Sequence, residues 1–458
     1  MMQGHVSELE NLAGVSGFLV GWYLIAALAN GGAAVYWWRQ RRAPGGAAGV
    51  QAWLPSLLWL AAAAGFLGLS AVALSGQPSA LSLLSLPQPL RDAADRVLGP
   101  TLVMVGAVVL LVGFYFGRQF FVRSGVAWSV LNLALLGLGL SLTDPDFVAI
   151  VARPDNVPIV GLVFLLGFFT WLAARQAVRN DRRLARHEPP LEAVDQQRVL
   201  VWPDLVYIEL ICMVALMTLL LVWSILLKAP LEQPASTVQT PNPSKAPWYF
   251  LGLQELLMYF DPWMAGVVVP ALIIFGLMVL PYLDVNAQGN GYYTIAERKF
   301  AYLAFQFGFL VLWIVPMLLG TFCRGPNWSF FGLYETWDVH KVEALNNVQL
   351  SERFWIDWLG RPLPAAPAGA AGWQQLCAVM LRESPGLVLL GVYLLVLPGA
   401  LARYSRPIWA LRNRQGRCRY WITLWLLLLM ALLPLKMLCR WLFNMNYFVA
   451  IPEYFFNI

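Results

Sequence analysis

Ten apolar stretches dominate the sequence, and each is long enough, or nearly so, to cross a bilayer as a helix of about 20 residues. Charged residues make up 12% of the 458 residues and hydrophobic residues 59%. A water-soluble fold has too little interior to bury so much apolar surface. The sequence therefore predicts an all-α integral membrane protein. The expected spans are residues 16–38, 52–75, 100–117, 125–143, 157–174, 205–227, 263–283, 300–320, 386–402 and 420–440.

The Lys and Arg residues between the spans predict one orientation in the membrane. Nineteen of them lie in alternate loops, at 39–50, 118–124, 175–204, 284–299 and 403–419. The other loops and the two ends, about twice as long together, hold only 10, and basic residues mark cytoplasmic loops. We therefore expect both termini and the long loops 228–262 and 321–385 on the extracytoplasmic side of a bacterial-type inner (cytoplasmic) membrane. The same distribution accounts for the net charge of +6, so no nucleic-acid partner is expected.

A polar run at residues 176–203 separates two groups of five spans. Its charged residues and Pro189-Pro190 are typical of a cytoplasmic linker, although basic residues that only set the topology give the same pattern. Residues 1–175 place few polar groups inside their spans, and Asn132 is an exception. An intramembrane Asn is more often a helix–helix hydrogen bond than a site, so we expect a five-helix membrane scaffold or subunit contact there. The remaining expected parts are 204–320, the loop 321–385 and the terminal helices and tail 386–458.

Few residues are available to hold a metal or a haem. The five cysteines form no C-x-x-C pair and no haem-attachment motif. A disulfide between Cys323 and Cys377 requires their loop to be extracytoplasmic. Only three histidines occur, His5, His187 and His340, and none lies in an apolar stretch. Two membrane haems with paired His ligands require four, so this chain cannot supply them.

The loop 228–262 is the segment most informative about function. Its six prolines favour a stiff, extended chain on the membrane surface. They are Pro230, Pro234, Pro241, Pro243, Pro247 and Pro262. After Pro247, the amphipathic stretch 248–260 predicts a helix at the interface, with Gln254 and Glu255 among its aromatic residues. Two interpretations stay open: an aromatic-belt helix, or a wall of an apolar pocket for a lipid-soluble ring.

The order of an apolar span, this proline-rich loop, the Trp-Tyr-Phe-Leu sequence at 248–251 and two further spans resembles the C-terminal half of cytochrome b. In the chloroplast-type complex that half is a separate small subunit, subunit IV. The family carries Pro-Glu-Trp-Tyr in this loop, at the quinol-oxidation site on the positive side of the membrane. Trp248 and Tyr249 match its last two residues, and Thr-Pro-Asn-Pro at 240–243 resembles its proline-rich approach. The resemblance covers residues 195–320 and extends more weakly to residue 440.

The sequence departs from this motif at the proton acceptor. The family's Glu, which accepts a proton from quinol, is Pro247 here. The resemblance therefore implies that Glu255, or secondly Asp261, takes this role, which requires access to water and a pKa near the working pH. Glu255 follows Trp248 by seven residues, close to two helical turns, so one helix would place both on the same face. The alternative is a solvated interfacial charge. The residues implied to bind the quinone ring are Trp248, Tyr249 and Phe250.

A second point of resemblance lies at the start of the sixth span. In respiratory members of the family, a Pro is followed six residues later by an acidic residue of the quinone-reduction site. Pro203 and Glu209 have this spacing, but the basic residue that usually precedes the acid is Ile208. Because an acidic group inside a span is costly, Glu209 either borders a quinone site or reaches the headgroups or a partner subunit.

The long loop 321–385 contains Asp338, His340 and Glu343, which together suggest metal ligands. A lone His beside scattered carboxylates is more often a hydrogen-bonded surface group. We therefore interpret this loop as a docking surface for an extracytoplasmic redox partner.

The resemblance implies a haem-free membrane subunit of a cytochrome bc-type quinol oxidoreductase that is catalytic only within the complex. Quinol would bind in a shared pocket and give one electron to a Rieske-type iron–sulfur protein. The other electron would cross the membrane through haem b in a separate cytochrome b N-terminal subunit. The further expected partners are a cytochrome c-type acceptor and membrane lipid, in a dimer of complexes.

Two functions of other classes stay open. A transporter predicts charged groups facing one another at mid-bilayer and an internal repeat, whereas these spans are nearly free of charge. A structural, quinone-linked anchor of another oxidoreductase would not need the Trp248-Tyr249 pair on the positive side.

Overall fold

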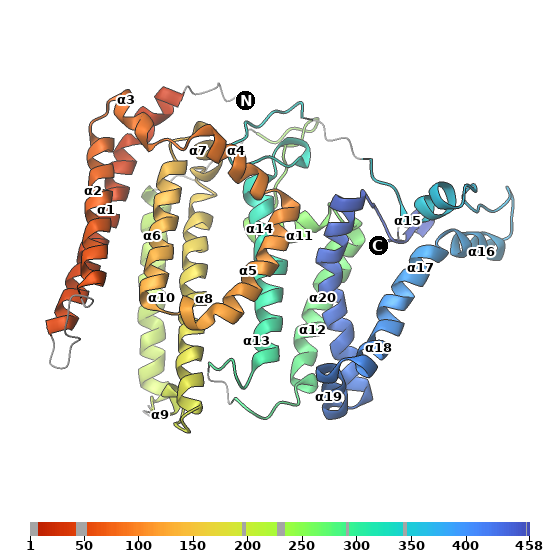
Figure 1. Cartoon of the computed structure of the whole chain (residues 1–458). Coiled ribbons are helices and arrows are strands. Elements are labelled where there is room, and N and C mark those ends of the chain that lie inside the picture. Colours follow the sequence, from red (N-terminus) through yellow and green to blue (C-terminus); the bar gives the residue numbers. More distant parts are fainter. Residues whose placement is uncertain are drawn as a thin grey trace.

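The structure, a computed structural model, describes residues 8–42, 53–194, 198–226, 234–289, 293–341, 346–454 and 456–458. This part of the chain is mainly helical with almost no sheet, and ten of its helices are long and apolar enough to cross a membrane (Figure 1). The predicted all-α fold with ten spans is therefore confirmed, and the chain is a multi-pass membrane protein. The ten spans are Glu10–Gln40, Leu54–Leu74, Pro100–Phe121, Ser124–Ser141, Val157–Leu184, Val201–Leu226, Met264–Leu283, Lys299–Cys323, Ser384–Tyr404 and Arg417–Phe443.

The first half contains five long helices joined by short ones. The long helices are α1 (Glu8–Arg42), α2 (Leu54–Leu74), α5 (Pro100–Phe121), α6 (Ser124–Ser141) and α8 (Val157–Leu184). The short elements are α3 (Pro78–Leu81), η2 (Ser82–Leu84), α4 (Gln88–Val97), α7 (Pro145–Val151) and α9 (Leu191–Val194). Proline stands in the first turn of α2, α4, α5, α7 and α8, where its missing N–H leaves no hydrogen bond unmade.

In the second half, most spans combine several helical elements. They begin with η3 (Val201–Leu205) and α10 (Val206–Leu226), then η5 (Met264–Val268) and α12 (Val269–Leu283). The eighth span runs through α13 (Lys299–Gln306), η6 (Phe307–Ile314), α14 (Val315–Leu318) and η7 (Leu319–Cys323). The ninth and tenth are α17 (Ser384–Gly391), η10 (Val392–Val396) and α18 (Leu397–Tyr404), then α20 (Arg417–Phe443). Between the spans lie η4 (Trp248–Phe250), α11 (Leu251–Leu256), η8 (Pro326–Trp328), α15 (Leu350–Glu352), η9 (Arg353–Trp358), α16 (Gly372–Arg382) and α19 (Arg406–Gln415).

Three of these spans widen into π-helical turns at the same distance from a proline. The π-turns η5, η6 and η10 each end two residues before a proline, at Pro270, Pro316 and Pro398. A proline cannot donate the hydrogen bond that closes the preceding α-turn, and its ring crowds the carbonyl four residues back. The turn before it therefore opens, which explains why these spans are not uniform α-helices.

The connections gather at the two ends of the helical array. Figure 1 shows α3, α4, α7 and α15 toward its upper end, and α9 and α19 at its lower end. The Lys- and Arg-rich loops that contain α9 and α19 lie at this lower end. Which compartment each end faces stays a prediction from the basic residues.

At the upper end, the two halves of the chain interlock. The Asp95 carboxylate of α4 accepts the backbone N–H of Tyr334 at 3.2 Å, and the Tyr334 and Ser141 hydroxyls lie 2.7 Å apart. The Tyr334 ring stacks on Phe147 of α7. Residues 325–341, which follow the eighth span, are thus held on the first half of the chain.

At the lower end, α8 makes a second junction. The expected linker begins inside this helix, which continues to Leu184. The Asp181 carboxylate accepts the backbone N–H groups of Ile295 and Ala296 at 3.0–3.2 Å, and the Asn180 amide donates to the Tyr293 carbonyl at 3.0 Å. Residues 176–184 therefore pack against the turn that leads into the eighth span.

Asn132 joins two spans, as expected. Its side-chain oxygen accepts a hydrogen bond of 2.5 Å from Asn30 of α1, whose own oxygen accepts the Trp128 indole N–H at 2.9 Å. The prediction of a helix–helix hydrogen bond is confirmed.

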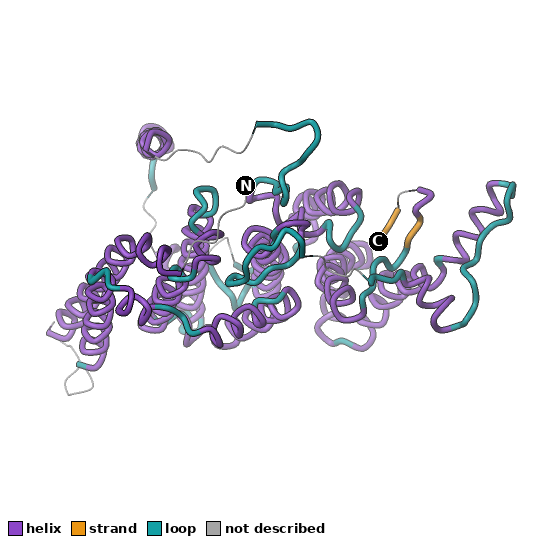
Figure 2. The backbone as a smooth tube through the Cα atoms, turned by 90° about the horizontal axis from the view of Figure 1, so that it is seen from above, coloured by secondary structure: helices purple, strands orange, loops and turns teal. Residues whose placement is uncertain are grey.

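Helix α10 differs from the other spans because none of its residues is buried. Figure 2, which looks along the helices, shows it standing apart from the rest of the array. Its surface is left to the membrane or to another subunit.

The end of the chain folds back on the ninth span. The strands β1 (Ala450–Ile451) and β2 (Phe456–Asn457) flank η11 (Pro452–Tyr454) and pair antiparallel, with Ala450 opposite Asn457. The Glu383 carboxylate accepts the Ala450 N–H at 2.9 Å, and a Cβ at Gly386 would lie 1.8 Å from the Phe448 carbonyl oxygen. Only a glycine permits this contact.

Candidate functional site

Helix α11 is seated against the eighth span through two glycines. A Cβ at Gly252 of α11 would lie 3.2 Å from the Trp313 carbonyl oxygen, and a Cβ at Gly320 would lie 3.2 Å from the Leu251 carbonyl oxygen. The two backbones therefore approach closely, and Leu256 packs in a core cluster with Val311 of that span. This contact fixes the segment that follows the proline-rich loop.

The proline-rich loop is tied to the same elements by polar side chains. Gln254 of α11 accepts the Ala246 N–H and donates to the Ser244 carbonyl, both at 2.8 Å. The Lys245 ammonium donates to the Thr321 carbonyl at 2.7 Å. Asn242 exchanges hydrogen bonds of 2.6 and 3.0 Å with Asn327 of η8.

At the centre of the site is a buried ion pair between Glu255 and Arg324. Two hydrogen bonds join them, from Arg324 Nε to Glu255 Oε2 at 2.9 Å and from Nη2 to Oε1 at 2.6 Å. The Tyr259 hydroxyl donates to Oε1 at 3.0 Å, and Arg324 also donates to the Trp328 carbonyl at 3.1 Å. Glu255 is 0% exposed and Arg324 3%. This pair locks α11 to the end of the eighth span, because a buried charge is tolerated only with a well-placed partner.

Next to this pair is a hollow of about 300 Å³. It is lined by Asn242, Pro243, Ser244, Gln254, Leu257, Met258, Asn327 and Trp328. Apolar side chains with a few convergent amides are the usual lining of a site for a small organic ligand.

The family comparison falls on this segment. Residues 234–324 match the family model for cytochrome b(C-terminal)/b6/petD. Over these residues the chain is similar to the C-terminal domain of cytochrome b. The match includes the proline-rich loop, α11 and both members of the ion pair, and it leaves residues 1–233 and 325–458 outside. No solved structure matches the chain.

Within the matched segment, the three aromatic residues predicted to bind quinone lie together on its outside. Trp248, Tyr249 and Phe250 are 41%, 46% and 50% exposed, and neighbouring rings have centroids 5.6 and 4.8 Å apart. The structure thus presents a continuous aromatic surface, and its binding of a quinone stays a prediction.

The expectation that Trp248 and Glu255 lie on one regular helix is wrong. Residues 248–250 form the 3-10 turn η4, and the α-helix begins only at Leu251. The two side chains differ in burial, since Trp248 is 41% exposed and Glu255 0%. The aromatic residues face outward and Glu255 inward. The helix also ends at Leu256 instead of Phe260.

The two predicted proton acceptors occupy different surroundings. Glu255 lies in the ion pair, away from the water access that this role requires. Asp261 is partly exposed, and its carboxylate accepts the Trp263 N–H at 3.1 Å and the Asn457 side-chain N–H at 2.8 Å. Both roles stay predictions, and Asp261 is the more accessible of the two.

The domain also shifts the pKa of two side chains near the ion pair. Burial lowers the pKa of the Lys245 ammonium to about 8. Burial, together with the negative charge of Glu255, raises the pKa of the Tyr259 hydroxyl well above its usual value. Lys245 and Arg324 were not predicted as site residues. The sequence feature that points to Arg324 is a cation at the end of an apolar span. Its partner Glu255 lies 69 residues earlier in the chain.

The remaining predicted site residues lie elsewhere. Glu209 is exposed on α10, distant from the site in sequence, and its quinone role stays a prediction. His340 is exposed, and its N–H donates to Asp338 at 2.8 Å. Glu343 and Pro230 lie outside the described residues. Among the residues that the structure describes, no cluster suited to a metal ion occurs. Cys323 is buried and Cys377 exposed, and they are not bonded.

Proposed function

We propose that this chain is a haem-free membrane subunit of a cytochrome bc-type quinol oxidoreductase in a bacterial-type inner membrane. The observation that carries the proposal is the exposed aromatic surface Trp248–Phe250 on a cytochrome b C-terminal domain. Such a surface would form one wall of an apolar binding site and leave the opposite wall to be supplied. A partner subunit would supply the other wall, and a quinol ring would lie between them.

The chain's own residues would contribute binding and proton transfer. The aromatic faces suit an apolar ring, and the amides around the adjacent hollow suit its oxygen atoms. Quinol oxidation releases two protons, so a carboxylate with access to water is needed. Protonating Glu255 would leave Arg324 buried and unpaired, which disfavours it as an acceptor. We therefore favour Asp261 as the acceptor and Glu255 as the residue that positions α11.

A haem does not fit the residues of this chain. His187 lies just beyond the cytoplasmic end of α8, His340 lies in a polar loop, and His5 is outside the described residues. No pair of His side chains from facing spans is available as axial ligands. We therefore propose that haem b belongs to a separate cytochrome b N-terminal subunit. A Rieske-type iron–sulfur protein and a cytochrome c-type acceptor would complete the complex on the side of residues 321–385.

The exposed helix α10 supports a partner subunit. A span with no buried residue gains nothing from packing within its own chain. We propose that the haem-bearing subunit covers α10, with Glu209 at or near their contact. On the same basis we propose a division of the chain into five parts. They are a 1–175 scaffold, a 176–203 linker, a 204–320 domain, the 321–385 loop and the 386–458 terminal helices.

Affinity purification of the tagged chain from native membranes tests the proposal. We expect b-type haem, an iron–sulfur protein and quinol:cytochrome c reductase activity to co-purify. Replacing Tyr249 with Leu should lower the activity about tenfold without changing the haem content, since one good aromatic contact contributes about 1–1.5 kcal/mol. The control Tyr404→Leu alters an exposed aromatic residue at the opposite end of a span. Purification without haem or reductase activity would refute the proposed function.

Asp261→Asn tests the proton acceptor separately. We expect lower turnover in a complex of normal haem content, with a changed pH profile. An unchanged pH profile would move the proton acceptor to another residue and leave the subunit assignment intact.

A further inference from the structure

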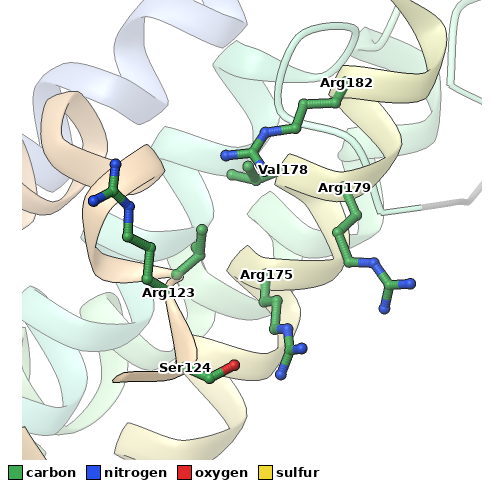
Figure 3. Close-up of a pocket in the computed structure, with 7 residues that line it drawn as sticks. Arg123, Ser124, Arg175, Val178, Arg179 and Arg182 are labelled. Carbon is green, nitrogen blue, oxygen red and sulfur yellow. The ribbon is translucent and has the colours of Figure 1, made fainter. Parts of the chain in front are cut away.

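A second hollow, of about 270 Å³, lies between the α5–α6 turn and α8 (Figure 3). Four of its seven lining residues are arginines, and we call it the arginine pocket. Its lining residues are Val122, Arg123, Ser124, Arg175, Val178, Arg179 and Arg182. Figure 3 shows Arg182 reaching from α8 toward the turn that carries Arg123, while Arg179 extends away from that turn. Positive groups from two elements thus surround one hollow.

The charges of the arginine pocket are not neutralised by the protein. Among the described residues, Arg123, Arg175 and Arg182 form no ion pair. Arg123 lies over the Phe120 ring, Arg175 over the Trp171 ring, and Arg182 donates to the neutral amide oxygen of Gln119. Like charges held together repel one another, so the pocket gains free energy when an anion enters.

The nearest carboxylates along the chain are engaged elsewhere. Asp181 binds the backbone at residues 295 and 296. Glu192 accepts hydrogen bonds from Gln176 and Asn180, and its charge acts on Arg179. Arg123, Arg175 and Arg182 are therefore the pocket arginines that lack a counter-ion among the described residues.

The first turn of α6 adds to this positive potential. Ser124 begins this 18-residue helix, and the helix has neither an acidic residue in its first turn nor a capping side chain. The N–H groups of a first turn have no partner inside the helix and favour an anion. They lie at the same hollow as the guanidinium groups, because Ser124 lines it.

The pocket continues into an exposed apolar strip along α8. Arg175, Arg179 and Arg182 follow the i, i+4, i+7 spacing of one face of α8. The same face continues toward the bilayer centre with Phe168 and Leu172, which are 50% and 41% exposed. The arginines suit the anionic headgroup of a phospholipid, and the apolar strip suits its acyl chains.

We propose that the arginine pocket binds the phosphate of an anionic membrane phospholipid. Guanidinium groups pair with phosphate oxygens through two parallel hydrogen bonds, and basic pockets between spans at the cytoplasmic surface suit such headgroups. The acyl chains would lie along Phe168 and Leu172. A free phosphate ion offers the same headgroup chemistry without the apolar part. This site is independent of the proposed quinol function, since it lies outside the cytochrome b C-terminal domain.

Native mass spectrometry of the delipidated protein, in its purified complex, tests this site. Detergent-solubilised phosphatidylglycerol is the probe, and phosphatidylcholine is the zwitterionic reference. Arg123→Gln/Arg175→Gln should weaken phosphatidylglycerol binding about thirtyfold, because each basic residue contributes a several-fold factor. Arg186→Gln/Arg198→Gln removes the same charge from residues outside the pocket and should change binding less than about threefold. Arg175→Lys, which keeps the charge but loses the planar fork, should fall between them.

Each outcome supports or overturns the site. The site is supported if Arg123→Gln/Arg175→Gln loses phosphatidylglycerol binding while Arg186→Gln/Arg198→Gln does not, with phosphatidylcholine binding unchanged. Equal loss in both double variants would overturn it, because binding would then follow total charge. Displacement of the lipid by equimolar inorganic phosphate would assign the pocket to free phosphate and overturn the lipid. If the pocket double variant does not assemble, full binding by Arg175→Lys would overturn the proposed pairing.

Discussion

Replacing Glu255 with Gln should destabilise the protein strongly, because it leaves Arg324 as a buried charge without its counter-ion. Both residues are nearly inaccessible, and two hydrogen bonds join them. Removing one partner of such a pair costs about 3–5 kcal/mol, and 1.4 kcal/mol changes an equilibrium tenfold. The folded population should therefore fall by a factor of about 10² to 4 × 10³ relative to the unfolded one. Arg324→Gln should have a similar effect.

The double variant Glu255→Gln/Arg324→Gln separates the pair from its surroundings. It leaves no unpaired charge, so its loss should be much smaller than the sum of the two single losses. We expect a coupling free energy of about 3 kcal/mol from the double-mutant cycle. The measurement is reversible unfolding in mixed micelles with increasing denaturing detergent, followed by helical circular dichroism.

Glu453→Gln is the matched control. Glu453 also forms a two-bond pair, with Arg382, through contacts of 2.9 Å, but its side chain is 46% exposed. Exposed pairs contribute about 0–1 kcal/mol, so this variant should be almost as stable as the wild type. A loss at Glu255 no larger than at Glu453, or additive single losses, would refute the reasoning from burial.

Three further predictions concern the fold. The Lys245 ammonium should titrate near pH 8 by NMR of the dimethylated protein, and a midpoint near 10.5 would contradict its burial. Because this pKa is lower when folded than when unfolded, the destabilisation from burying the charge is present below pH 8 and is relieved between pH 8 and 10.5. Gly386→Ala should destabilise the protein by about 1–3 kcal/mol, since its Cβ would meet the Phe448 carbonyl, whereas Gly391→Ala in the same helix meets nothing and should not. Asn132→Ala should cost about 0.6–2 kcal/mol in the same unfolding assay through loss of the bond from Asn30, and an unchanged midpoint would contradict that bond's contribution.

The spans were predictable because the bilayer itself sets their length. A helix must satisfy its own backbone in hydrocarbon, so apolar length alone located all ten, and Asn132 stood out as a polar residue among apolar ones. The helical geometry inside each span was harder to predict from the sequence. The π-turns before Pro270, Pro316 and Pro398 follow from proline geometry, but their extent depends on packing around each span.

The candidate site was predictable in its position and not in its orientation. Trp248 and Tyr249 located the segment, which the family comparison confirms. The assumption of one regular helix placed Glu255 beside them. The acid instead lies buried and bonded to Arg324. A partner 69 residues away cannot be inferred from local periodicity, because only the close approach at Gly252 and Gly320 brings the two segments together.

The isolation of α10 has a consequence for biosynthesis. Beyond Glu209 in its first turn this helix carries no charge, and it buries no residue, so no stripe on its surface selects a neighbour within the chain. Its insertion depends on its own transfer into lipid, and its lateral position is decided afterwards, by helix association. If a partner subunit covers α10, as the proposed function has it, a newly made copy would keep an unpaired transmembrane helix until that subunit is synthesised. Matching the supply of the two subunits would then determine how long that helix is available to wrong neighbours and to membrane proteases.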